Sequence, residues 1–148
     1  MLEETAKRDL VLVPTDSTDE AAKADAGAAL YWHNVAKTRI ADRRPIGAKL
    51  VQASSGRVLG GLWGRTELGL LFLDLFFLDE EIRGRGYGAW LLKQVEDRAK
   101  ARGCTRAIVE TSSFQAPEFY ARCGYEEFGR VPFGVAAHAR IFLRKTLA

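Results

Sequence analysis

A glycine-rich stretch between an apolar run and a helical pattern restricts most strongly the folds open to this chain. The apolar run ends at Leu78, "EEIRGRGYGAWLL" occupies residues 80–92, and apolar residues recur at helical spacing from Leu91 to Ala99. Gly103 is suited to end that helix, and the apolar segment "TRAIVET" follows it. A strand, a helix and a strand in this order predict a parallel crossover within a larger sheet.

The N-terminal quarter of the chain predicts one strand and a helical region. "DLVLVP", Asp9–Pro14, reads as a short strand stopped by proline. Ser17 or Thr18 is suited to cap a helix, and the alanine-rich sequence that follows favours one helix, or two broken near Gly27, to about Thr38.

The middle of the chain predicts three consecutive antiparallel strands after a loop, "ADRRPIG", at Ala41–Gly47. Turn signals lie at Ser54–Gly56 and at Glu67–Gly69, and the glycines between them indicate bulges or close packing. The third strand, about Leu70–Leu78, is apolar on both faces, so we expect it to lie centrally in the sheet.

The last third predicts a short helix in "APEFYARCGY" and two closing strands, roughly Tyr125–Val131 and Ala139–Thr146. The expected fold is therefore α/β, or α+β in the sense of a mixed, mainly antiparallel sheet of six to seven strands flanked by helices. A length of 148 residues fits a single domain over residues 1–148.

Composition excludes several classes of protein. Lys and Arg number 22 against 19 Asp and Glu, and the two signs alternate, so a nucleic-acid partner is not favoured. The longest apolar stretch is too short to span a bilayer and is interrupted by Asp74, and the charged N-terminus shows no signal sequence. Two cysteines and two separated histidines give no metal spacing. We expect a reduced, cytoplasmic protein with no metal and no membrane partner.

The glycine stretch allows three interpretations. It could simply be a tight turn, although three alternating glycines exceed what a turn requires. Gly84-x-Gly86-x-x-Ala89 matches a dinucleotide loop, but the chain after Glu110 is too short for the rest of that fold. In the third interpretation, a phosphate group rests on the helix N-terminus.

The third interpretation gains support from a second motif about 30 residues later. Arg83-x-x-Gly86-x-Gly88 and the pair Phe119-Tyr120, followed by Gly124-Tyr125, together resemble the GNAT acetyltransferase superfamily. The acetyl-CoA loop of that family reads Q/R-x-x-G-x-G/A, and a tyrosine precedes x-x-x-G-F/Y on a later helix. The resemblance covers about Leu68 to Tyr125 with good specificity, and the order of strands extends it to the whole chain.

The resemblance implies roles for individual residues. The strand before the loop would splay from its neighbour and offer main-chain groups to the pantetheine arm of acetyl-CoA, and Tyr120 would be the general acid for the leaving thiolate. Ser113 stands where many members carry an asparagine, which places one contact to coenzyme A in question. The cofactor-binding residues predicted in this way are Phe76, Phe77, Leu78, Arg83, Gly84, Arg85, Gly86, Tyr87, Gly88, Ala89 and Ser113.

The general base is less constrained by the sequence. Asp74 is the one carboxylate in the apolar third strand, and strict alternation places it on the face of Phe76 and Leu78. Burying a carboxylate is costly unless it is paired or protonated, so a buried Asp74 would be a candidate catalytic residue. Alternatively, Asp74 forms a buried salt bridge with an arginine, or a bulge turns it to water. Glu67, Glu110, His138 and a relay through water are alternatives.

The predicted function is transfer of the acetyl group of acetyl-CoA to an amine by direct attack in a ternary complex. A small-molecule amine is favoured over a protein amino group. Other classes that remain open are a non-catalytic module that binds CoA or nucleic acid and an NAD(P)-binding protein. A homodimer is compatible with the sequence.

Overall fold

The computed structural model describes residues 9–147. Contacts divide the chain into two units, one ending at Ala41 and one beginning at Asp42. The expectation of a single domain over residues 1–148 stays a prediction.

The first unit contains one helix, α1, Glu20–Thr38. Its N-cap is Asp19, whose carboxylate accepts a hydrogen bond from the backbone N–H of Ala22, so the prediction of Ser17 or Thr18 as cap is wrong. Asp, like Ser and Thr, satisfies a free amide of the first turn, and here the carboxylate closest to the helix takes that place. The helix continues through Gly27 without a break.

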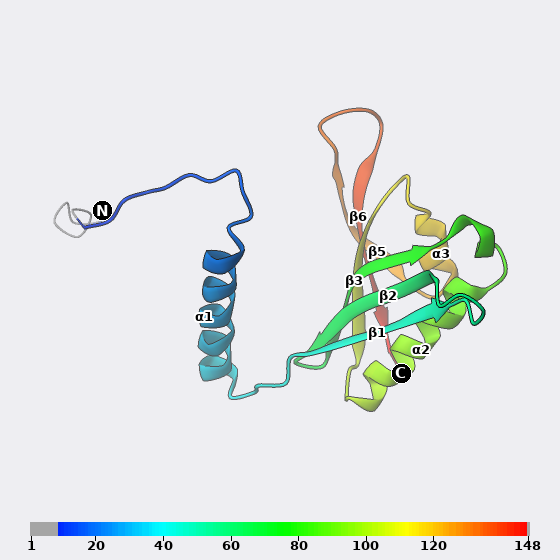
Figure 1. Ribbon diagram of the computed structural model, residues 1–148, viewed down its shortest axis with the longest axis horizontal. Helices are drawn as coiled ribbons and strands as arrows, with labels where there is room; N and C mark the ends of the chain where they lie inside the picture. Colours follow the sequence, from blue (N-terminus) through cyan, green and yellow to red (C-terminus); the bar gives the residue numbers. More distant parts are fainter. Residues whose placement is uncertain (1–8, 148) are drawn as a thin grey trace. The chain divides into compact units, whose positions relative to one another are not determined.

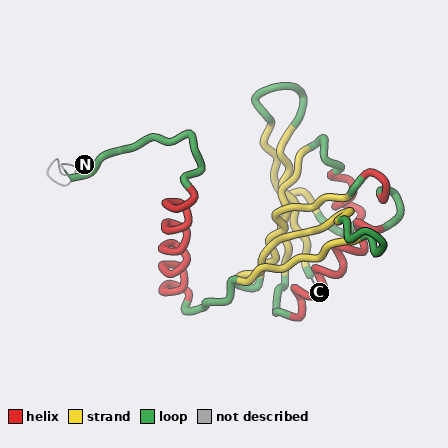
Figure 2. Tube along the Cα trace, viewed as in Figure 1, coloured by secondary structure: helices red, strands yellow, loops and turns green. Residues whose placement is uncertain are grey.

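The strand predicted at Asp9–Pro14 is absent. These residues form no ladder with another strand and are drawn as loop in Figure 2. A strand is stable only where its backbone groups find a partner strand, and a period-two apolar pattern does not supply one.

The second unit is a six-stranded mixed sheet in the order β1-β2-β3-β4-β6-β5, with helices α2 and α3 (Figure 1). All neighbouring pairs are antiparallel except β3 and β4, which are parallel and joined through α2. The predicted fold class, the central place of β3 and the parallel crossover are confirmed. The elements are β1 Arg44–Val51, β2 Val58–Glu67, β3 Leu70–Leu78, a 3-10 turn Glu80–Ile82, α2 Tyr87–Ala101, β4 Arg106–Ser112, α3 Pro117–Arg122, β5 Glu126–Pro132 and β6 Ala139–Thr146.

The first strand of the sheet begins earlier than the sequence predicts. Residues 44–47 of the expected loop Ala41–Gly47 belong to β1, where Arg44 pairs with Thr66 and Pro45 with Arg65. A proline is tolerated there because β1 is an edge strand and has a ladder on one side only. The two expected turns are present, and the second contains Leu68 and Gly69, both with positive φ.

One apolar core joins α2 to the sheet. Leu92, Val95 and Ala99 of α2 are almost fully buried, and α2 packs against β1, β2 and β3. Gly103, with φ of 92°, ends the helix as predicted, because a left-handed residue there costs glycine little. The same core includes Tyr120 of α3 and Tyr125 beyond it, so the start of α2, α3 and the sheet are held together.

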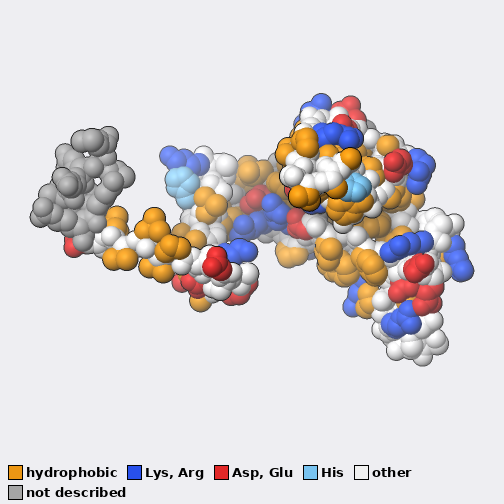
Figure 3. All heavy atoms as spheres, turned by 90° about the horizontal axis from the view of Figure 1, so that it is seen from above, with side chains coloured by type: hydrophobic (Ala, Val, Ile, Leu, Met, Phe, Trp, Pro, Cys, Tyr) orange, Lys and Arg blue, Asp and Glu red, His pale blue; other side chains and the backbone are white. Residues whose placement is uncertain are grey.

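The described surface carries charges of both signs. On the face shown in Figure 3, Lys and Arg side chains lie among Asp and Glu side chains. Within residues 9–147, no helix is long and apolar enough to cross a membrane. Cys104 and Cys123 are free thiols, and the described residues contain no cluster of three or more potential metal ligands.

Candidate functional site

Strands β3 and β4 run side by side for only four residue pairs, from Leu70↔Arg106 to Leu73↔Val109. Beyond Leu73 the partner of β3 is β2 alone, through Leu75–Leu78. The change coincides with a bulge at Asp74, which has no partner in the β2 register. A bulge bends its strand, so β3 turns away from β4 and leaves its β4-facing backbone groups outside any ladder.

A cleft of about 700 Å³ opens where β3 and β4 separate. One wall is the second half of β3 together with Arg83 and Gly84 of the following loop. The other wall combines the end of β4, the start of α3 with the loop before it, and one side chain of β6. Its lining residues are Leu73–Leu78, Arg83, Gly84, Val109–Thr111, Phe114–Ala116, Phe119, Tyr120 and Arg140.

The glycine stretch forms the entry to α2 beside this cleft. Gly84 and Gly86 have φ of 74° and 85°, and a Cβ on either would meet no atom within 4 Å. Gly86 is the N-cap of α2, and no side chain caps the helix. The amides of the first turn therefore face open space, where the helix dipole favours an anion.

The other residues of this stretch have different environments. The Nε of Arg83 donates a hydrogen bond to the Leu78 carbonyl at 2.9 Å, so this side chain ties the loop to the end of β3. Gly88 is buried, and a Cβ there would lie 3.1 Å from the Phe119 ring, which explains the need for glycine in packing terms. Tyr87 packs against the Trp90 ring at 6.5 Å. Arg85, Gly86, Tyr87, Gly88 and Ala89 do not line the cleft itself.

The three residues predicted to bind the pantetheine arm all line the cleft. Phe76 is half-buried and packs on the rings of Phe119 at 5.4 Å and Tyr120 at 6.3 Å. Phe77 is exposed, and Leu78 continues the strand to the loop. In the sheet these three residues pair with β2 alone, so the edge of β3 that faced β4 has no ladder partner here.

Tyr120 projects from α3 into the same cleft. Its ring is buried among Phe76, Phe119 and Tyr125, with ring centroids between 5.3 and 6.3 Å apart. Burial raises the pKa of Tyr120 to about 12, with a smaller contribution from Cys123. Among residues 9–147, no group hydrogen-bonds the Tyr120 hydroxyl, which is therefore free to donate to a molecule in the cleft.

Asp74 also lines the cleft, and of the alternatives left open by the sequence the structure shows a bulge that turns it to water. The bulge turns the residue outward, and 53% of its side chain is exposed. Its carboxylate accepts a hydrogen bond from Nη1 of Arg65 at 3.1 Å. Strict alternation fails at this point because the bulge inserts one residue into the strand.

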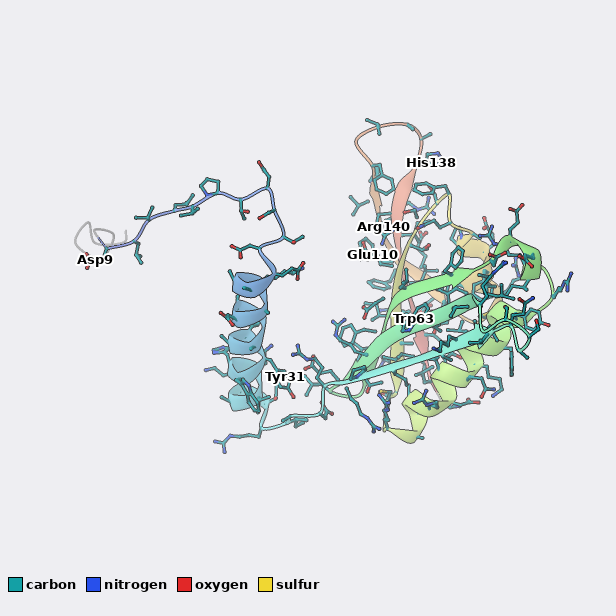
Figure 4. All side chains as sticks on the ribbon, in the orientation of Figure 1. Asp9, Tyr31, Trp63, Glu110, His138 and Arg140 are labelled. Carbon is teal, nitrogen blue, oxygen red and sulfur yellow. The ribbon has the colours of Figure 1, made fainter. Side chains whose placement is uncertain are left out.

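A polar network on β4 and β6 forms part of the opposite wall. Glu110 accepts a hydrogen bond from Nε of Arg140 at 2.7 Å, and Nη1 of Arg140 donates to Oγ of Ser112 at 2.9 Å. Figure 4 labels Glu110 and Arg140 on these neighbouring strands. Arg140 was not anticipated from the sequence, because only the β4–β6 register, with Ser112 opposite Arg140, brings it to the cleft.

The remaining candidates are not among the residues that line the cleft. Oγ of Ser113 lies 3.2 Å from Nδ1 of His138 and accepts a hydrogen bond from the Ala139 N–H at 3.0 Å. Glu67 pairs with Leu70 at the far end of the β2–β3 ladder from Leu78. The cleft thus brings together Asp74, Glu110, Tyr120 and the end of β3, whereas Glu67, Ser113 and His138 do not line it.

Comparison with protein families shows to which family the chain belongs. Residues 15–125 match the model of the acetyltransferase (GNAT) family, which is most of the chain. The chain belongs to the GNAT family. It is an acyltransferase, and acetyl-CoA is its acetyl donor.

Individual relatives of this GNAT protein agree. It is 35% identical over 108 residues to a blasticidin-S acetyltransferase of Streptomyces morookaense, covering 69% of this chain and 79% of the relative. It is 32% identical to the acetyltransferase Atu2258 of Agrobacterium fabrum, covering 79% of this chain and 85% of the relative. A crystal structure described as an acetyltransferase from Agrobacterium tumefaciens superposes with a TM-score of 0.86 at 28% identity, over 93% and 99% of the two chains.

Proposed function

We propose that this GNAT enzyme acetylates a small-molecule amine by direct attack on acetyl-CoA bound in the β3–β4 cleft. The observation that carries the proposal is the cleft itself, which joins unpaired strand backbone and a phenol in one space and has Gly84 of the loop before α2 in its wall. The family shares the acetyl donor, and the relative named for blasticidin S acts on a small molecule by that name.

The pyrophosphate of the donor would rest on the first-turn amides of α2, where Gly84 and Gly86 leave room for it. Arg83 and Arg85 add positive charge on the same loop. The pantetheine arm would then run along Phe76, Phe77 and Leu78, whose backbone groups can replace the missing strand. Whether Ser113 contacts coenzyme A stays a prediction.

In the proposed reaction, the amine nitrogen forms a bond to the thioester carbon while the carbon–sulfur bond breaks. Asp74 accepts the proton that the attacking nitrogen loses, directly or through water. The thiolate leaves toward the Tyr120 hydroxyl. Because both carboxylates of the cleft can attract a cationic amine, Glu110 is the alternative base, although it is already paired with Arg140.

The pKa of Tyr120 restricts how it can act. A phenol with a pKa of about 12 keeps its proton throughout the neutral range, so the donor form is always present. Complete transfer to a thiolate whose conjugate acid has a pKa of about 8.5 would be uphill by roughly 5 kcal/mol. Tyr120 therefore acts mainly as a hydrogen-bond donor to the developing thiolate, and solvent supplies the proton that finally stays on sulfur.

A screen of amines tests the substrate class. The enzyme is incubated with acetyl-CoA and a panel of blasticidin S, simple amines, amino acids and peptides with free N-termini or lysines. Release of the coenzyme A thiol is followed, and the acetylated product is identified by mass. Activity confined to the peptides would contradict the small-molecule assignment.

Initial-rate kinetics with the best amine test direct attack. Varying both substrates gives intersecting reciprocal plots for a ternary complex, whereas an acetyl-enzyme intermediate gives parallel lines. We expect intersecting plots. A cytoplasmic location is part of the proposal and agrees with the free thiols of Cys104 and Cys123. Assembly as a homodimer stays a prediction.

A further inference from the structure

A buried polar cluster lies behind the cleft, outside its lining. Glu96 of α2 is 7% exposed and accepts two hydrogen bonds, from the Tyr125 hydroxyl at 2.7 Å and from Nζ of Lys145 at 2.9 Å. Lys145 of β6 also lies over the Tyr125 ring, 5.5 Å from its centre. The cluster therefore joins α2, β6 and the chain between α3 and β5, and none of its three residues lines the cleft.

Stability alone is a weak explanation for this cluster. A buried ion pair loses hydration at both charges, and apolar residues of similar size commonly stabilise a core as well or better. Glu96 lies beside core residues such as Val95 and Leu92, where an apolar side chain would pack without that cost. A hydrogen-bonded carboxylate does provide a fixed direction, because it holds its donor at one distance and angle.

Glu96 holds the hydroxyl of Tyr125, whose ring packs against the ring of Tyr120. The Tyr125 ring meets the Tyr120 ring edge-on, with centroids 5.8 Å apart, and the Tyr125 N–H donates to the Tyr120 carbonyl at 2.9 Å. Because no protein group in the described chain bonds the Tyr120 hydroxyl, packing contacts, those with neighbouring rings among them, set the position of the ring. Of the three rings around it, only that of Tyr125 is itself held by a hydrogen bond, since Phe76 and Phe119 have no polar atom.

We infer that Glu96, held by Lys145, positions Tyr120 for acetyl transfer by fixing the hydroxyl of Tyr125. Tyr125 and Glu96 are positioning residues that touch neither substrate, and the inference rests on the role proposed for Tyr120. The cluster thus links α2, which begins after the glycine loop, to the Tyr120 phenol in the cleft.

Tyr125→Phe isolates the hydroxyl while keeping the ring. We expect the Kd for acetyl-CoA to change little and the melting temperature to fall by several degrees, because the buried Glu96 carboxylate loses one hydrogen bond. Assayed well below that melting temperature, kcat should fall about tenfold, because small displacements of an aligned group slow transfer steeply. The KM for acetyl-CoA should stay within about twofold of the wild type, since the loop that binds its phosphates is untouched. An unchanged kcat would overturn the inference.

A double mutant separates this inference from the proposed function. If Tyr125 acts only through Tyr120, the variant Tyr120→Phe/Tyr125→Phe has the same kcat as Tyr120→Phe alone. Effects that multiply would contradict positioning through Tyr120. If Tyr120→Phe alone keeps the wild-type kcat, the role proposed for Tyr120 fails, and this inference fails with it.

Rescue by a conservative variant tests Glu96. Glu96→Gln keeps an oxygen that can accept from the Tyr125 hydroxyl, so we expect kcat within about threefold of the wild type. Glu96→Leu removes the acceptor and should match the loss seen in Tyr125→Phe. Both are assayed at saturating acetyl-CoA, well below the melting temperature of each variant, and equal kcat values for the two would overturn the inference.

Discussion

Tyr120 holds its proton because three aromatic rings and little water surround it. Ionising a phenol in such a site loses hydration, and burial is the main cause of its raised pKa. The position of the motif tyrosine was predictable from the sequence. Its environment was not, because the rings come from β3, α3 and the segment after α3.

The stability of the protein at high pH should report this burial. The pKa of Tyr120 is about 12 when folded and about 10 when unfolded. Between these values the unfolded chain loses the proton first, so the free energy of unfolding falls as pH rises from about 10 to 12. At pH 11 this loss is about 1.4 kcal/mol.

Urea unfolding at pH 8 and pH 11 checks this prediction, with Tyr120→Phe as the control. The wild type should lose about 1.4 kcal/mol more than the variant between the two pH values. An equal loss in both proteins would mean that Tyr120 ionises as freely in the folded protein as in the unfolded chain.

Asp74 shows where sequence reasoning was correct and where it failed. Strict alternation places Asp74 on the face of Phe76 and Leu78, and a bulge that turns it to water was the alternative; the structure shows the bulge. A bulge depends on how β2 and β3 pair, and Gly64 opposite it, closely packed against Phe72, was only a general hint.

Substitution of Asp74 tests its proposed role. Asp74→Asn should lower kcat by about tenfold or more with an unchanged melting temperature, because the side chain is exposed and its amide cannot accept the proton. Arg65→Ala is the matched control, since it breaks the same ion pair from outside the cleft lining. If both variants slow the reaction equally, the ion pair rather than the carboxylate is responsible.

At the scale of elements, the glycine loop and α2 form the unit that we propose binds the pyrophosphate. Gly84 and Gly86 allow positive φ, whereas Gly88 is required by contact with Phe119. Alternating glycines in the sequence predicted close approach to a ligand, yet they could not distinguish the two open positions from the packed one.

Gly86→Ala should impair the loop specifically. A left-handed alanine costs about 1 kcal/mol of stability, and strain at the N-cap displaces the amides that would hold the pyrophosphate. We expect a raised KM for acetyl-CoA with kcat less affected. Gly56→Ala is the control, because Gly56 has φ of 73° and equally open surroundings in the turn before β2. A similar KM change in both variants would contradict the role of the loop.

The elements beyond the loop were predicted in order, and the errors lie at the start of the chain. The closing strands and α3 begin within a residue or two of expectation. The strand expected at Asp9–Pro14 has no partner, and β1 begins at Arg44 within a segment whose charge and proline suggested a loop. Local pattern alone does not identify pairing partners.

On the scale of the whole molecule, the link between Glu96 and Lys145 ties α2 to the last strand. Lys145→Met leaves a buried carboxylate with one hydrogen bond and no counter-charge. Because Lys145 is itself 25% exposed, we expect a loss of about 2 kcal/mol in the free energy of unfolding, below the usual range for fully buried pairs.

Lys93→Met is the control for this prediction. It breaks the exposed pair between Lys93 and Asp97 on the same helix and should leave the stability unchanged. Chemical denaturation of the two variants gives the comparison. Equal stabilities would indicate that Glu96 and Lys145 contribute no more than a surface pair.

The cleft exists because β3 leaves β4 after four paired residues, and this divergence is a property of the assembled sheet. The family resemblance led us to expect such a separation and the residues along it. Arg140 and Phe114 were missed because they reach the cleft through the β4–β6 register and the loop before α3.

The most direct test compares the wild type and Tyr120→Phe with the best amine from the panel, measuring coenzyme A release and the Kd for acetyl-CoA. We predict that both bind acetyl-CoA with similar Kd and that the variant releases coenzyme A about 100-fold more slowly. Equal rates of release, or binding of acetyl-CoA without transfer to any amine by the wild type, would contradict the account.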